Sequence, residues 1–156
     1  MPHTIDRIGF RRALPCVTVA LLGVVVGGAI SAVLAHAPAR PVMWLVAYLV
    51  LVVGVAQGAL ALVQAGVALR PPSRGLVAAQ CITFNLANAL VIAGTLLAHP
   101  AWVSAGAVLL VVALGLFMGG VRGARGALVW VYRVLVATLA ASALVGVALA
   151  VWRARG

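Results

Sequence analysis

Five long apolar runs, separated by short breaks rich in proline, glycine and arginine, restrict what this chain can fold into. The runs cover residues 13–35, 42–69, 76–98, 101–121 and 128–152. Each run reaches the roughly 20 residues that an α-helix needs to cross a bilayer. Because every backbone group in hydrocarbon must pair within its own segment, each run is expected to be a helix. The sequence therefore predicts an all-α integral membrane protein, a bundle of five transmembrane helices.

The ends of these runs suggest simple boundaries. Residues 1–12 are expected to form a basic cytoplasmic tail, residues 13–152 the bundle, and residues 153–156 a short C-terminal tail. Pro15 is expected in the first turn of the first helix, where a missing N–H costs little. The second run would measure about 42 Å as a helix. That length predicts a helix that tilts or protrudes from the bilayer.

The charges are few and one-sided. Only 8% of the 156 residues are charged, against about 25% in a soluble domain. The chain has eleven arginines and one acidic residue, Asp6. A nucleic-acid surface needs its basic residues gathered on one face, whereas these arginines stand singly or in pairs between apolar runs. We therefore expect the lipid bilayer as partner, and no nucleic acid.

The arginines also predict an orientation. With five spans, eight of them fall at one end of the bundle, namely Arg7, Arg11, Arg12, Arg70, Arg74, Arg122, Arg125 and Arg133. Arg40, Arg153 and Arg155 fall at the other end. The positive-inside rule then places the N-terminus in the cytoplasm and the C-terminus outside a cell membrane. The four tryptophans lie near predicted helix ends, as do Tyr48 and Tyr132, and an interfacial aromatic belt requires this placement.

The first run has an alternative interpretation. Its basic start and its Ala35-His36-Ala37 ending are also features of a cleaved signal peptide. Its apolar stretch is longer than the 7–15 residues typical of such a peptide. A retained span is therefore favoured, while cleavage near residue 37 would leave four spans with both ends outside.

Small residues recur at every fourth position in four of the five runs. They are Gly23, Gly27, Ser31 and Ala35, then Gly54 and Gly58, then Gly115 and Gly119, and finally Thr138, Ser142, Gly146 and Ala150. Residues four apart share a helix face, so each series makes a groove that another backbone can approach. We expect these grooves to pack within the bundle, with contacts to a partner or a second copy as the alternative.

The third run carries an unusual number of polar side chains. Cys81, Asn85, Asn88 and Thr95 fall within an arc of about 80° on a helix. The second run offers Gln57 and Gln64, seven residues apart and thus on one face. Because amides in lipid are costly without partners, the two faces are predicted to meet. Gln57, Gln64, Asn85 and Asn88 form either a packing network or an intramembrane polar site.

Residues suited to catalysis are scarce. Arg133, the one charge inside a run, is expected to extend to the cytoplasmic interface or to bind a lipid headgroup or phosphate. The acidic residue lies in the tail, so the runs contain no carboxylate for acid–base work or proton relay. Two loop histidines such as His36 and His99 could bind haem or copper, but such pairs more often have no role in binding. We expect no catalytic residues, metal or cofactor.

These observations favour a small non-catalytic membrane protein, an accessory subunit or scaffold of a membrane complex. Its partner would be another membrane protein or a second copy, contacted through the small-residue grooves. The alternatives are a transporter or lipid-handling protein with a polar site between spans two and three, and an enzyme or redox carrier.

Overall fold

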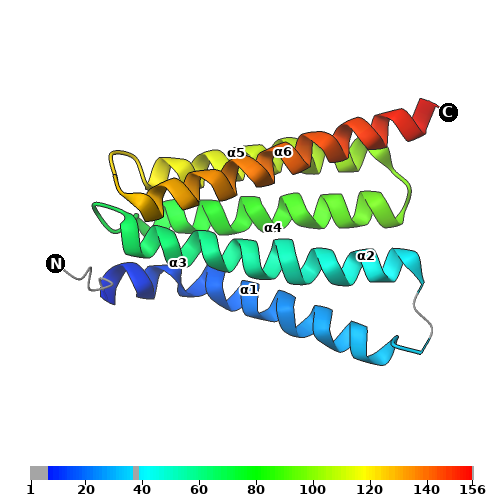
Figure 1. Ribbon diagram of the computed structural model, residues 1–156, viewed down its shortest axis with the longest axis horizontal. Coiled ribbons are helices and arrows are strands. Elements are labelled where there is room, and N and C mark those ends of the chain that lie inside the picture. The colour runs from blue at the N-terminus through cyan, green and yellow to red at the C-terminus, as the bar shows by residue number, and fades with distance from the viewer. Residues whose placement is uncertain (1–6, 37–38, 156) are drawn as a thin grey trace.

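The computed structural model describes residues 7–36 and 39–155, and every regular element in these ranges is a helix (Figure 1). The elements are α1 (Arg7–Val33), α2 (Arg40–Tyr48), η1 (Leu49–Ala56), α3 (Gln57–Val67), α4 (Arg74–Leu96), α5 (Pro100–Gly120) and α6 (Ala127–Arg155). Since α2, η1 and α3 are continuous, five helices are long and apolar enough to cross a membrane. The prediction of an all-α membrane bundle is confirmed.

The first helix begins earlier than the apolar run suggests. It starts at Arg7 rather than near residue 13, because arginine is a good helix former and the basic segment simply continues the helix. Pro15 therefore lies inside α1, and its predicted place in the first turn is wrong. The other described helix ends lie within three residues of the predicted run boundaries. Residues 1–6, including Asp6, lie outside the described residues.

The second span contains a π-helical stretch, η1, that no sequence pattern predicts. Such stretches are rare, usually a single turn, and frequent at functional sites. This stretch lies against α1: a Cβ at Gly54 would come 3.2 Å from the carbonyl oxygen of Ala20. A Cβ at Gly23 would come equally close, 3.2 Å, to the carbonyl oxygen of Leu49. Glycine thus allows the wide turn and α1 to pack backbone against backbone.

The helices pack in two groups that lie side by side (Figure 1). In one group α1 runs along η1 and α3, and in the other α4 packs closely on α5, with α6 against α5. The backbones of span two and α4 approach each other less closely. Between the groups lies an apolar core that includes Leu60, Phe84 and Phe117, the two phenylalanine rings packing edge to face at 6.2 Å.

Small residues at seven-residue spacing hold the α4–α5 pair together. The series is Ala87 and Gly94 on α4, and Gly106 and Ala113 on α5. Seven residues are two helical turns in a left-handed pair, so each series keeps one face toward its neighbour. A Cβ at Gly106 would come 2.8 Å from the Ala87 carbonyl oxygen, and one at Gly94 would come 2.7 Å from the Val103 nitrogen. The sequence prediction followed four-residue spacing and missed this interface.

The two ends of the bundle differ in charge. The start of α1 lies at the same end as the α3–α4 and α5–α6 loops, and the C-terminal end of α6 lies at the other end (Figure 1). The first end therefore carries the eight arginines that the five-span model groups together. There Arg12 donates hydrogen bonds to the carbonyl oxygens of Pro71, at 3.2 Å, and Pro72, at 2.8 Å. These bonds tie the α3–α4 loop to α1.

Candidate functional site

A reciprocal amide pair joins the two helix groups. The Gln64 Nε2 donates to Gln80 Oε1 at 3.3 Å, and the Gln80 Nε2 donates to Gln64 Oε1 at 3.1 Å. Both side chains are buried. The Gln80 amide also donates to the carbonyl oxygen of Leu116 at 3.0 Å. The single hydroxyl proton of Tyr132 on α6 is shared between the carbonyl oxygen of Phe117, at 3.1 Å, and the more distant Gln64 Oε1, at 3.5 Å. One pair thus connects α3, α4, α5 and α6.

The amide of Gln57 lies about two helical turns before Gln64 on span two, and it extends toward α1. Its Nε2 donates to the carbonyl oxygen of Cys16 at 3.3 Å and to the sulfur of Cys81 at 3.7 Å. The side chain is 0% exposed, and its Oε1 is the one buried side-chain polar atom without a hydrogen-bond partner among the described residues. A buried acceptor without a donor is costly, so this oxygen calls for an explanation.

The two asparagines bond mainly to their own helix. Asn85 donates to the carbonyl oxygen of Cys81 at 2.8 Å, and Asn88 donates to that of Phe84 at 2.9 Å. Asn88 also accepts a hydrogen bond of 2.8 Å from the hydroxyl of Tyr48 on α2. The asparagines are therefore held by local bonds and by one tyrosine.

The predicted meeting of the two amide faces needs correction. Gln57 does meet the predicted face at Cys81, but Gln64 pairs with Gln80 instead, and no described hydrogen bond joins either glutamine to Asn85 or Asn88. Gln80 lies about 100° from Cys81 on the helix, outside the arc that carries the asparagines. Its seven-residue spacing from Ala87 is the signal that assigns it to the buried side. Tyr48 and Tyr132, expected in the interfacial belt, are the partners that sequence reasoning missed.

Removing one amide of the reciprocal pair is expected to destabilise the fold. We expect Gln80→Leu to lower the free energy of unfolding by about 1–3 kcal/mol, because it leaves the buried Gln64 amide without its main partner. The measurement is reversible unfolding in mixed micelles. The Gln64→Leu/Gln80→Leu double variant should lose less than the sum of the single variants, because coupled partners are not additive. Strict additivity would contradict the pairing.

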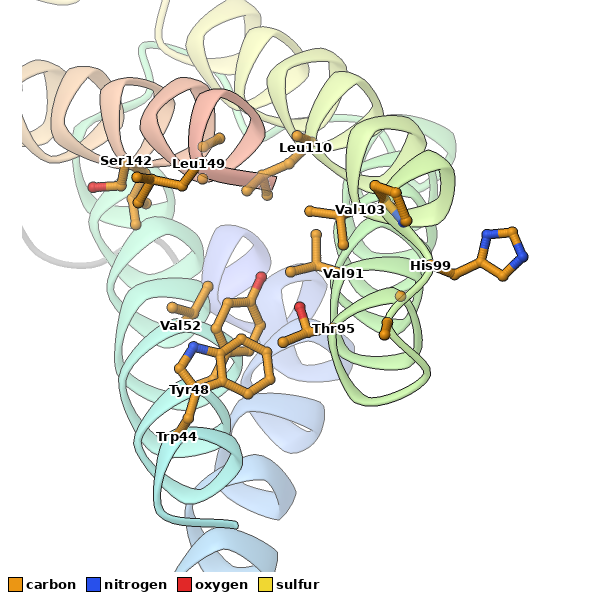
Figure 2. Close-up of a pocket in the computed structure, with 17 residues that line it drawn as sticks. Trp44, Tyr48, Val52, Val91, Thr95, His99, Val103, Leu110, Ser142 and Leu149 are labelled. Atoms are coloured by element: carbon orange, nitrogen blue, oxygen red, sulfur yellow. The ribbon is translucent and has the colours of Figure 1, made fainter. Parts of the chain in front are cut away.

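A separate cavity lies at the other end of the bundle, between α2, the α4–α5 pair and α6 (Figure 2). Its volume is approximately 620 Å³, within the range of about 300–1,000 Å³ that ligand sites occupy. Most of its lining is apolar, contributed for instance by Val52, Val91, Val103, Leu110 and Leu139. No charged side chain appears among the described residues that line it.

The polar groups of this cavity are few and come from α2, α4 and α6. Trp44 and Tyr48 stand on α2 with their rings 5.1 Å apart, and Thr95 lies opposite on α4 (Figure 2). The imidazole of His99 points away from the cavity (Figure 2). The Ser142 hydroxyl donates to the carbonyl oxygen of Thr138 on its own helix at 2.8 Å. The site is thus an apolar chamber whose lining includes two aromatic rings on α2 and the three hydroxyl-bearing residues Tyr48, Thr95 and Ser142.

The small-residue grooves fall into two sets. Gly23, Gly27 and Gly54 lie where α1 meets span two, and a Cβ at Gly58 would only touch Ala20 at 3.5 Å. A Cβ at Gly115, Gly119 or Gly146 would meet no described atom within 4 Å, and Ser142 is exposed. The predicted packing within the bundle is therefore wrong for these last four positions. Four-residue spacing identifies small residues that share a helix face, but it does not identify what packs against that face.

The remaining predicted residues lie on the surface. Arg133 is exposed on α6, one residue after the buried Tyr132. His36 and His99 are both exposed, and His99 stacks on Trp102 with ring centroids 5.4 Å apart. Among the described residues no group of three or more His, Cys, Asp or Glu side chains is placed to hold a metal ion.

Comparison with known protein families, with curated proteins and with solved structures found no match to this chain. Arguments about function therefore depend on the geometry described above.

Proposed function

We propose that this chain is a non-catalytic, lipid-handling membrane protein that holds an apolar chain in the cavity between α2, α4, α5 and α6. The cavity itself carries the proposal. Its volume of approximately 620 Å³ and its apolar lining fit a hydrocarbon chain, and the bilayer around the bundle is a reservoir of such chains.

The route into the cavity is consistent with this proposal. The helices α2 and α6 diverge toward this end of the bundle (Figure 1), and α6 packs on span two through α3 at the other end. An acyl or prenyl chain can therefore enter sideways, between α2 and α6. The lack of charge on the described lining favours the chain itself, rather than an ionic headgroup, as the part that enters.

The amide network is consistent with a binding site in the cavity rather than among the amides. Every polar atom of Gln64, Gln80 and Asn88 has a partner among the described residues, as expected of side chains that fix packing. The Gln64–Gln80 pair connects the two helix groups at one end of the bundle, and the cavity occupies the other end, where Asn88 holds the hydroxyl of the lining residue Tyr48. The polar site predicted between spans two and three is therefore better explained as scaffold than as binding site.

The test is to purify the protein in a mild detergent and to record native mass spectra. We expect one lipid or prenyl chain per polypeptide to survive the removal of bulk lipid. A protein that is free of such chains, and that stays free after incubation with a lipid supply, would contradict the proposal.

We further propose that the protein lies in a cell membrane with its N-terminus in the cytoplasm and all five spans retained. The eight-to-three division of arginines supports this orientation. Retention of α1 is supported by its packing: Ala13 and Cys16 are buried against α3, and Cys16 supplies the acceptor for Gln57. The predicted cleavage site includes Ala37, which lies outside the described residues.

Fusions at the C-terminus test this topology. A reporter that is active only outside the cytoplasm, fused after Gly156, is expected to be active, and a reporter that needs the cytoplasm is expected to be silent. Both reporters should reverse if Arg7, Arg11 and Arg12 do not face the cytoplasm.

A second candidate function is the accessory subunit or scaffold. It is favoured by Gly115 and Gly119 on α5, where an added Cβ would meet nothing within 4 Å. A groove of this kind can receive a helix of another membrane protein or of a second copy. Recovery of a stable partner with the native protein would support this candidate.

A further inference from the structure

Two amide side chains converge on the half-buried sulfur of Cys81, in the first half of α4. The Nε2 of Gln57 and the Nδ2 of Asn85 each lie 3.7 Å from Cys81 Sγ. A primary amide has two N–H donors. Each amide directs one N–H to a backbone carbonyl, of Cys16 or of Cys81 respectively, and leaves the other for the sulfur. A sulfur that receives two N–H donors is arranged to carry negative charge.

A second thiol stands beside this sulfur. Cys16 on α1 is 1% exposed, its Sγ lies 3.9 Å from the carbonyl oxygen of Val77, and Cys81 packs against the buried cluster that contains Cys16. Both cysteines are free. Val77 is one helical turn before Cys81, so the two cysteines come together from facing helices rather than from one short motif. No spacing in the sequence indicates that they meet.

The surroundings mark this place as more than packing. The oxygen of Gln57 is buried without a donor, and Gln57 directly follows the π-helical stretch η1. Unsatisfied buried atoms and π-helical turns are both enriched at functional sites. In the part of the chain that the structure describes, no group of three or more His, Cys, Asp or Glu side chains is placed to hold a metal ion, so the ligands that this place offers are the two sulfurs.

We propose that Cys16 and Cys81 bind one soft monovalent metal ion, Cu(I), between α1 and α4. Thiolate sulfur selects Cu(I) over hard cations, and two sulfurs satisfy an ion that accepts linear coordination. On binding, each thiol releases its proton to the solvent and forms one sulfur–copper bond, so that the complex carries a single negative charge and no electron is transferred. The N–H groups of Gln57 and Asn85 then stabilise that charge as outer-shell donors.

The test is an anaerobic titration of the full-length protein in detergent with Cu(I) supplied from a coloured competing chelator. We expect one Cu(I) per chain in the wild type and none in Cys81→Ser or Cys16→Ser, whose hydroxyl is a poor ligand for a soft ion. Asn85→Leu and Gln57→Leu should still bind one ion, with affinity about 10–100-fold lower. Thr83→Val, a polar-to-apolar change on the same helix without a part in the site, should bind like the wild type.

Folding is kept separate from binding by helical content and by monodisperse elution, measured on each variant before titration. The serine variants change a single atom of each side chain and serve as the decisive pair. Copper retained equally by the wild type and by the Cys16→Ser/Cys81→Ser double variant would overturn the proposal. Equal affinity of Asn85→Leu and the wild type would overturn the role of the converging amides.

Discussion

Gly106→Ala is expected to lower the free energy of unfolding by about 1–3 kcal/mol, since overpacking a close interface costs this much or more. The added Cβ would lie 2.8 Å from the carbonyl oxygen of Ala87 and 2.9 Å from the nitrogen of Val91. Both contacts are backbone atoms of a helix, which cannot move aside as a side chain can. The α4–α5 pair would have to separate along its length.

A matched control lies on the same helix. Gly115 is also inside α5, but a Cβ there meets nothing within 4 Å. Gly115→Ala should therefore be neutral or stabilising by up to about 1 kcal/mol, from helix propensity alone. The measurement is reversible unfolding of both variants under one set of conditions. Equal effects at the two positions would contradict the close packing of α4 on α5.

This pair of glycines also shows what the sequence can and cannot predict about packing. Four-residue spacing singled out Gly115 and Gly119, which face open space, and passed over Gly94 and Gly106, which hold two backbones together. The helices themselves were predictable, because an apolar run of this length has only one way to satisfy its backbone in lipid. Which glycine faces which helix depends on the crossing of the helices, and local spacing does not carry that information.

The candidate sites also contain some features that the sequence predicts and others that it does not. Gln57 and Gln64 were predictable as a buried face, since seven-residue spacing and the cost of amides in lipid point the same way. Their partners were not, because Gln80 lies off the arc that holds the asparagines and Cys16 comes from a distant span. The cavity depends on the divergence of α2 and α6, and η1 has no sequence signature. Each of these features is set by tertiary packing.

The second large effect is expected in the cavity. Ala143 on α6 is half-buried and lines the chamber, so Ala143→Trp places an indole where the proposed chain lies. We expect this variant to retain at least about tenfold less bound chain, because the indole and the apolar chain cannot occupy the same volume in a close-packed interior. Ala141, two residues earlier and thus about 200° around the helix, is exposed and does not line the cavity. Ala141→Trp provides the same added bulk outside the chamber.

The central claim is that the cavity holds an apolar chain, and the most direct measurement is the native mass spectrum of these two variants beside the wild type. The account predicts one bound chain in the wild type and in Ala141→Trp, and an empty polypeptide in Ala143→Trp. Equal occupancy in Ala143→Trp and Ala141→Trp, or no bound chain in any of the three proteins, would contradict it.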